Sequence, residues 1–274
     1  MDLGLSGSAV AITGASQGIG LALALAFARE GANIAIFART PDRLETAAQQ
    51  IRALGVQCLA IATDLTAQDA CQLMIDQAAA HFGRLDVLVN NASTNVDRVP
   101  ASLEDASDSQ LLERFMGKTM VAIKCTRAAI PHMRRGGGGR IICIGGTAAR
   151  SVFRGGEQPG TGSGLPQGLG NSALVNFVKH LSEEVAADQI LVNAVHPHVT
   201  RTGRHPARVA GRAARLGITL HEAEAQMAAN FPIGRMIEPD DIAPMVLLLA
   251  SRLSGAITGQ SITIDGGALR GIFP

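Results

Sequence analysis

The sequence predicts an α/β protein with one doubly wound sheet of seven mostly parallel strands, covered by helices on both faces. Short apolar segments alternate with helix-like segments along all 274 residues, which is typical of parallel sheets. A glycine-rich turn joins the first of these strands to the first helix. No linker or internal repeat divides the chain, so we expect residues 1–274 to form one domain.

The first strand, turn and helix predict an anion-binding site. Residues 10–12 suit a buried strand, and residues 21–29 form an Ala/Leu-rich helix. Gly14, Gly18 and Gly20 lie between them and allow the backbone to turn tightly. Free N–H groups and the positive end of the helix dipole then converge where a dinucleotide pyrophosphate binds. The alternative is a tight turn that binds no ligand.

The remaining elements follow in order. Further strands are expected at residues 33–37, 57–62, 86–89, 140–144, 190–195 and 260–264. Helices are expected at residues 41–54, 67–82, 102–133 (broken near 107–109), 171–187 and 239–251. Residues 150–170 are rich in Gly and Pro and predict a long loop. Residues 202–230 form a polar insertion with helical stretches.

Composition limits the classes of partner. The formal net charge is +1 and charged residues make up 17% of the chain, which gives no reason to expect nucleic acid or a membrane surface. The four cysteines lack the CxxC spacing of metal sites, so we expect reduced thiols, no metal and a cytoplasmic protein. We find neither a signal-peptide pattern nor an apolar run long enough to span a membrane.

Several motifs together carry a family resemblance. They are Thr13-Gly14-x-x-x-Gly18-Ile19-Gly20, Asp64-Leu65, Asn90-Asn91-Ala92, Thr126-Arg127-Ala128-Ala129-Ile130-Pro131, residues 190–195 with Pro197, Ile257-Thr258-Gly259-Gln260 and Asp265-Gly266-Gly267. In this order and spacing, the chain resembles the short-chain dehydrogenase/reductase family over roughly residues 5–267. The resemblance implies a Rossmann-type sheet, a bound NAD or NADP, a small-molecule substrate beneath the 202–230 insertion, and a homodimer or homotetramer.

The resemblance also implies which residues bind the cofactor. They are Gly14, Ser16, Gln17, Gly18, Ile19, Gly20, Asp64, Leu65, Asn91, Ala92, Pro197, Thr200 and Thr202. The alternative for Asn90 and Asn91 is a structural role, in which their side chains form hydrogen bonds with backbone groups at the end of the strand.

The residues after the second strand favour NADP over NAD. NAD sites place a carboxylate there, whereas NADP sites place an arginine that binds the 2′-phosphate. Here the strand is followed by Arg39, with no carboxylate before Asp42. The guanidinium is a permanent cation suited to phosphate; the alternative is a solvated surface arginine.

The family's catalytic residues are missing. The family reduces carbonyls with a hydride from the nicotinamide and a proton from a tyrosine, assisted by a lysine, a serine and an asparagine. Position by position, the asparagine becomes Lys118, the serine Gly146, the tyrosine Gln167 and the lysine Asn171, and the chain has no tyrosine at all. Gln and Asn side chains do not titrate, so neither is a general acid.

Three side chains are candidate replacements. Thr147 offers a hydroxyl, Lys118 a cation, and His198 a group that titrates near neutrality. A structural role remains the alternative for each, as it does for His196.

A row of arginines lies in the insertion. Arg204, Arg208, Arg212 and Arg215 recur at helical spacing and would share one face. They predict either an anionic substrate tail, such as that of an acyl thioester, or a solvated charged surface.

Three functions therefore stay open. The first is an NADP(H)-dependent oxidoreductase with a non-standard active site and an unassigned substrate. The second is a nucleotide-binding sensor or partner subunit without redox activity. The third is a lyase or isomerase with His198 as its base.

Overall fold

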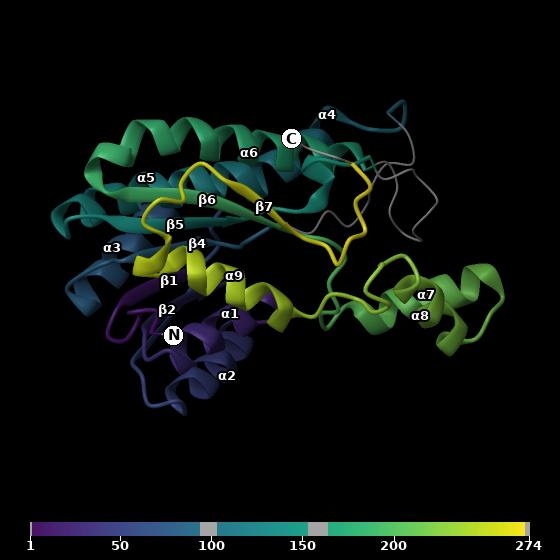
Figure 1. Ribbon diagram of the computed structural model, residues 1–274, viewed down its shortest axis with the longest axis horizontal. Helices are drawn as coiled ribbons and strands as arrows, with labels where there is room; N and C mark the ends of the chain where they lie inside the picture. The colour runs from purple at the N-terminus through teal and green to yellow at the C-terminus, as the bar shows by residue number, and fades with distance from the viewer. Residues whose placement is uncertain (1, 94–102, 153–163, 272–274) are drawn as a thin grey trace.

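The computed structural model describes residues 2–93, 103–152 and 164–271. Its centre is a seven-stranded sheet with strand order β3-β2-β1-β4-β5-β6-β7, in which every pairing is parallel (Figure 1). The strands are β1 (Ala9–Thr13), β2 (Asn33–Ala38), β3 (Cys58–Ala62), β4 (Val87–Asn90), β5 (Gly139–Ile144), β6 (Ile190–Pro197) and β7 (Ser261–Ile264). The predicted doubly wound fold is confirmed.

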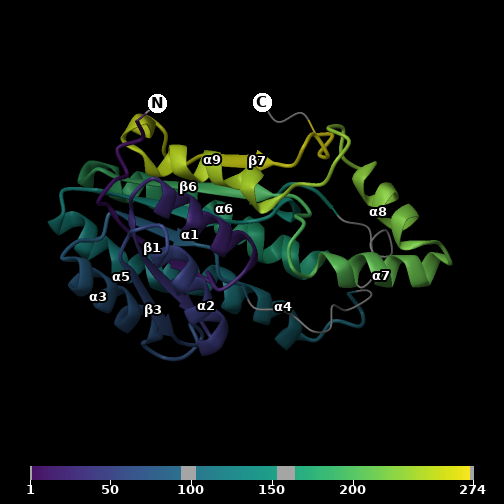
Figure 2. The ribbon, with the colours of Figure 1, turned by 90° about the horizontal axis from the view of Figure 1, so that it is seen from below.

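Helices cover both faces of the sheet. One face carries α1 (Gly18–Arg29), α2 (Pro41–Arg52) and α9 (Pro239–Ala250), and the other carries α3 (Ala70–Phe82), α5 (Val121–Arg135) and α6 (Leu165–Val185) (Figure 2). Short 3₁₀ turns lie at η2 (Thr147–Ala149), η3 (Ala186–Asp188) and η4 (Arg252–Ser254). No helix of the described residues is long and apolar enough to cross a membrane.

The apolar core has a separate layer on each face of the sheet. In β2, Ile34 and Ile36 pack toward α1 and α2, whereas Ala35 and Phe37 pack toward α3. This alternation follows from the two-residue period of a strand. All four cysteines are free thiols, and Cys71, Cys125 and Cys143 are buried.

The sheet topology determines where a ligand pocket forms. All seven carboxyl ends lie at one edge because every strand is parallel. β1 pairs with β2 on one side and with β4 on the other, so the connections after β1 and β4 diverge. Doubly wound sheets bind ligands at such a switch point.

The helix boundaries differ most from the prediction at the start of α6 and near residue 107. Helix α6 begins at Leu165 and not at residue 171, because Pro166 lies in the first turn, where its missing N–H costs nothing. The rest of the predicted loop includes residues 153–163, which lie outside the described part of the chain.

The predicted break at residues 107–109 is a helix start. Ser107 caps α4 (Asp108–Arg114) and accepts a hydrogen bond from the backbone N–H of Gln110. A π-helical turn, η1 (Phe115–Met120), then continues directly into α5. Residues 103–107 are not helical.

The 202–230 insertion contains two helices, α7 (His205–Leu216) and α8 (Leu220–Ala228). They pack against each other around a small apolar cluster of Val209, Ala213 and Ala223. Both helices project from the carboxyl edge of the sheet (Figure 1).

Candidate active site and cofactor pocket

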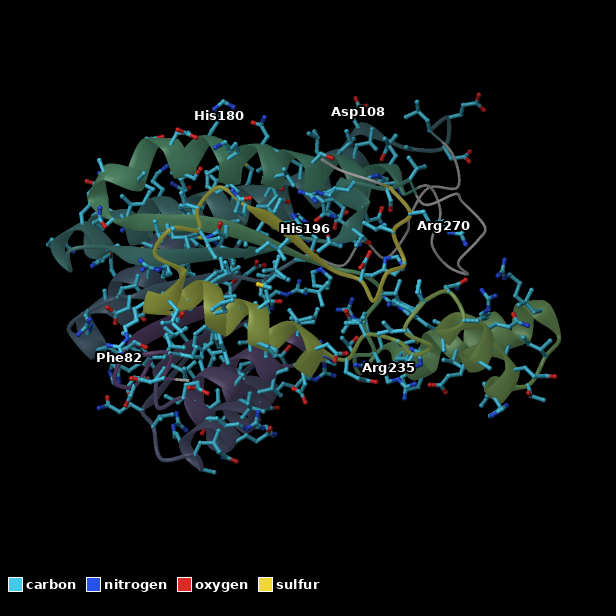
Figure 3. All side chains as sticks on the ribbon, viewed as in Figure 1. Phe82, Asp108, His180, His196, Arg235 and Arg270 are labelled. Atoms are coloured by element: carbon cyan, nitrogen blue, oxygen red, sulfur yellow. The ribbon has the colours of Figure 1, made fainter. Side chains whose placement is uncertain are left out.

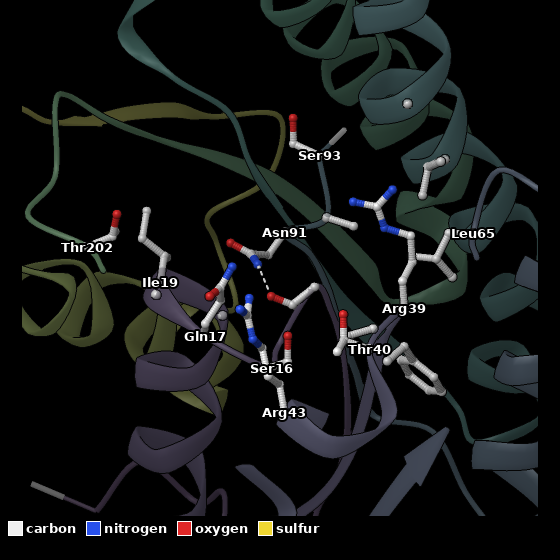
Figure 4. A pocket seen from close by; sticks show the side chains of 18 of the residues that line it. Ser16, Gln17, Ile19, Arg39, Thr40, Arg43, Leu65, Asn91, Ser93 and Thr202 are labelled. Atoms are coloured by element: carbon white, nitrogen blue, oxygen red, sulfur yellow. Dashed lines mark hydrogen bonds between the residues drawn. The ribbon is translucent and has the colours of Figure 1, made fainter. Parts of the chain in front are cut away.

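A pocket of about 480 Å³ lies at the switch point. Its wall comes from the glycine loop after β1, from the ends of β2, β3 and β4, and from α4, η1 and the start of α7. Figure 4 shows Arg39 and Leu65 at one side of this pocket and Ile19 and Thr202 at the other.

Close packing shapes the glycine loop. Gly14 and Gly18 have positive φ angles of 67° and 59°, which L side chains rarely adopt. A Cβ at Gly20 would lie 2.4 Å from the carbonyl oxygen of Gly14. The side chain of Gln17, the N-cap residue of α1, makes no capping hydrogen bond. The first N–H groups of α1 are therefore available to an anion.

Asn91 holds the loop in place. Its Nδ2 donates to the carbonyl oxygens of Thr13 and Gly14, both at 3.0 Å. The Thr13 hydroxyl oxygen accepts from the backbone N–H groups of Asn91 and Ala92. Asn90 turns into the core, where its Nδ2 donates to Thr126 Oγ1 at 3.0 Å.

One side of the pocket is basic. Arg39, Thr40 and Arg43 line it beside Asp64. Hydrogen bonds from the backbone N–H and hydroxyl of Thr66, with a smaller contribution from the charge of Arg39, lower the pKa of Asp64. Arg43 lies in the first turn of α2, four residues after Arg39, and was not among the residues predicted from the sequence.

Most of the predicted cofactor residues lie together in this pocket. The residues that line it are Gly14, Ser16, Gln17, Gly18, Ile19, Gly20, Arg39, Asp64, Leu65, Asn91, Ala92 and Thr202. Pro197 and Thr200 do not line it; Pro197 is buried at the end of β6, and Thr200 Oγ1 donates to the carbonyl oxygen of His198 at 2.9 Å.

Lys118 lies in the π-helical turn, at the carboxyl end of β5. Its Nζ donates to the carbonyl oxygen of Gly145 at 2.9 Å. Burial, together with the positive charge of Arg114, lowers the pKa of Lys118 to about 8. The side chain is therefore a partly buried cation at neutral pH.

His196 fills the space beside Gly145, near the carboxyl end of β6 (Figure 3). It is fully buried; Gly146 N–H donates to Nδ1 at 3.1 Å, and Nε2 lies 2.7 Å from Ser261 Oγ. Burial and the charges of Lys118 and Arg150 lower its pKa to about 4. His196 is therefore a neutral core residue.

Thr147 and His198 form a hydrogen-bonded pair. Thr147 Oγ1 lies 2.7 Å from His198 Nδ1, and only 3% of Thr147 is exposed. The imidazole packs edge-on against Phe231, with ring centroids 5.3 Å apart. Burial lowers the pKa of His198, and the charge of Asp265 opposes this effect. The two residues, predicted separately, thus form one hydrogen-bonded pair after the ends of β5 and β6.

Gln167 and Asn171 lie close to Gly146. The Asn171 amide donates to the carbonyl oxygen of Gln167 at 2.9 Å, and a Cβ at Gly146 would lie 3.3 Å from the same nitrogen. Gln167 Oε1 and Asn171 Oδ1 are buried without a donor among the described residues. Buried acceptors of this kind are usually satisfied by water or a ligand.

The four arginines of the predicted row do not all lie at the same site. Only Arg204 and Arg208 line the pocket. Arg212 turns to α8, where its Nη2 donates to Gln226 Oε1 at 3.0 Å. Arg114, from α4, also lines the pocket, and no pattern in the sequence pointed to it.

Comparison with known proteins identifies the family. A family model described as enoyl-(acyl carrier protein) reductase matches residues 14–268. The chain belongs to the short-chain dehydrogenase/reductase family.

Individual relatives span nearly the whole chain. It is 32% identical over 260 residues to the short-chain reductase protein NovJ of Streptomyces niveus, covering 95% of this chain and 93% of that protein. It is 29% identical over 263 residues to the NADPH-dependent reductase BacG of Bacillus subtilis, covering 95% and 97%. The structure of L-sorbose reductase from Gluconobacter frateurii, complexed with NADPH and L-sorbose, matches with a TM-score of 0.90 at 30% identity, covering 99% and 100%.

Proposed function

We propose that the protein is an NADP(H)-dependent oxidoreductase with a non-standard active site. The observation that carries this proposal is the charge of the pocket. At the ends of β2 and β3 its lining holds two arginines, Arg39 and Arg43, and among the described lining residues a single carboxylate, Asp64. A dinucleotide with a third phosphate matches this excess of positive charge better than one without it. BacG, which is named an NADPH-dependent reductase, and the sorbose reductase, whose structure is a complex with NADPH, support the same assignment.

The residues present fit this cofactor. The glycine loop and the first N–H groups of α1 would hold the pyrophosphate. Arg39 and Arg43 would bind the 2′-phosphate, because neither forms a salt bridge within the described part of the chain. Asp64 and Leu65 would lie at the adenine. When bound, NADPH supplies a hydride.

We assign proton transfer to Thr147 and His198. In reduction, the Thr147 hydroxyl would give its proton to the substrate oxygen. The protonated His198 would give the proton on Nδ1 to Thr147 Oγ1, over the 2.7 Å that separates these atoms. Because burial lowers the pKa of His198, reduction should slow as pH rises through a value below 6.5.

Cofactor binding is the first test. The chain contains no Trp or Tyr, so nicotinamide fluorescence is measured without protein background. We expect NADPH to bind more tightly than NADH, and Arg39→Ala to weaken NADPH binding by roughly 10–100-fold, as for a lost charge-assisted hydrogen bond. Arg29→Ala, an exposed arginine on α1, is the control. Equal NADPH affinity in wild type and Arg39→Ala would refute the assignment.

Turnover with a panel of carbonyl compounds is the second test. We expect His198→Gln to lose most of the NADPH oxidation while retaining wild-type NADPH affinity. Binding without turnover on any panel member would favour the sensor or partner subunit. The homodimer or homotetramer implied by the family stays a prediction, which light scattering would test.

A further inference from the structure

Three further arginines line the same pocket. Arg114 comes from α4, and Arg204 and Arg208 come from the start of α7. Arg204 follows two residues after Thr202, which Figure 4 shows across the pocket from Arg39. We call these three residues the α4–α7 arginine cluster.

The charges of this cluster repel one another. The positive charge of Arg204 contributes to lowering the pKa of both Arg114 and Arg208, in addition to the effect of burial. Among the described residues, no carboxylate lies within ion-pair distance of Arg204 or Arg208. Glu113 attracts Arg114 but does not line the pocket.

The two elements that carry the cluster have separate supports. Helix α4 packs against α6 and η1, whereas α7 packs mainly against α8. Arg114 and Arg204 therefore carry like charges on two elements that do not pack extensively against each other. An anion between the two elements would replace this repulsion by charge-assisted hydrogen bonds.

The proposed NADP(H) binding uses none of these three arginines. The phosphates of the dinucleotide are already matched by the glycine loop, the start of α1, and Arg39 with Arg43. Three further guanidinium groups suit a dianionic phosphate better than a singly charged carboxylate, because the phosphate offers more charge and more acceptor oxygens.

We propose that the α4–α7 arginine cluster binds a phosphate group of the substrate, so that the protein acts on phosphorylated carbonyl compounds. The proposal rests on the proposed NADP(H) function, because it assigns to the substrate only the arginines that the cofactor does not use.

The test uses protein saturated with NADPH and inorganic phosphate as the probe. Thermal stability is followed while phosphate replaces chloride at constant ionic strength. We expect phosphate to raise the Tm of the wild type and acetate to raise it less. Arg208→Ala and Arg204→Ala should each raise the apparent Kd for phosphate about tenfold, corresponding to ~1.4 kcal/mol.

Arg215→Ala is the matched control, since Arg215 lies on the same helix but does not line the pocket. It should leave the phosphate effect unchanged. Neither Arg204 nor Arg208 belongs to the apolar core, so both variants should fold, and the Tm without phosphate measures this directly.

Two outcomes would overturn the inference. The first is a phosphate effect that is absent from the wild type, equal to that of acetate, or the same in wild type and Arg208→Ala. The second is an Arg208→Ala variant that loses NADPH affinity as strongly as Arg39→Ala, which would assign the cluster to the cofactor. Failure of the wild type to bind NADPH would refute the proposed function instead, so the two failures are distinguishable.

Discussion

The contact between Gly145 and His196 predicts a large cost for a single methyl group. A Cβ at Gly145 would lie 2.2 Å from His196 Nδ1 and 2.5 Å from Cε1. The φ angle of Gly145 is not positive, so the cost of Gly145→Ala is steric and not conformational. The imidazole would have to move away from both Gly146 N–H and Ser261 Oγ.

The magnitude follows from these losses. Overpacking a well-packed core costs about 1–3 kcal/mol, and each lost buried hydrogen bond adds about 1 kcal/mol. We therefore expect Gly145→Ala to lower the free energy of unfolding by roughly 3–5 kcal/mol. Gly146→Ala is the matched control, because its Cβ would meet only the movable end of Asn171, at 3.3 Å. It should cost less than about 1 kcal/mol.

Urea unfolding followed by circular dichroism measures both variants, since the chain has no Trp or Tyr for intrinsic fluorescence. A double-mutant cycle isolates the contact. Once His196→Ala has removed the ring, adding Gly145→Ala should cost little more. The reasoning is refuted if Gly145→Ala costs under 1 kcal/mol, or if the two losses simply add.

Three further predictions concern the same edge of the sheet. Because the pKa of His196 is about 4 in the fold and about 6.5 in the unfolded chain, its contribution to stability is complete above pH 6.5 and is lost as pH falls toward 4, by up to about 3 kcal/mol. Urea midpoints across this range should fall less in His196→Gln; equal slopes would contradict the prediction. For Lys118, with a pKa of about 8 against 10.5 unfolded, the fold disfavours the charged form at pH 7. Lys118→Met should then raise the unfolding free energy by about 1–3 kcal/mol, a gain that shrinks between pH 8 and 10.5; a less stable variant at pH 7 would argue against it. Gly20→Ala should abolish NADPH binding in fluorescence titrations without loss of circular dichroism, because its Cβ would lie 2.4 Å from Gly14 O and 2.5 Å from Asn91 Nδ2. Unchanged affinity would show that the loop tolerates the methyl group.

Local sequence patterns were sufficient for the fold and the glycine turn, and the family resemblance supplied most of the predicted pocket lining. Buried β-branched runs such as residues 10–12 identify strands wherever they occur. Gly14 and Gly20 follow this strand and allow one backbone segment to approach another closely. A glycine-rich turn of this kind can be recognised from the sequence alone. Arg39 was identifiable because its place after β2 is set by the strand itself.

Tertiary packing determined what the sequence could not predict. Low helix propensity at Gly168 and Gly170 argued for a loop, yet α6 includes both residues. Gly170 is held there by the Thr119 hydroxyl, which donates to its carbonyl oxygen at 2.7 Å. This contact joins residues 51 positions apart, so no local periodicity in the sequence indicates it.

Tertiary packing also brings candidate residues together that are far apart in the sequence. Thr147 and His198 were each identified, but their hydrogen bond depends on the register of β5 against β6. Arg114 lies 90 positions before Arg204, and no local pattern links the two. The π-helical turn that places Lys118 likewise has no sequence signature.

The small apolar cluster of α7 and α8 has a consequence for dynamics. Val209, Ala213 and Ala223 form a cluster separate from the two main layers, so the helix pair is a candidate for a cooperative unit that opens before the sheet does. Its amide protons should then exchange with solvent through sub-global opening, faster than those of β1 or β4. Any ligand that joins α7 to the body of the protein would slow that exchange selectively. Exchange rates over residues 205–228 would thus report ligand binding without any catalytic turnover.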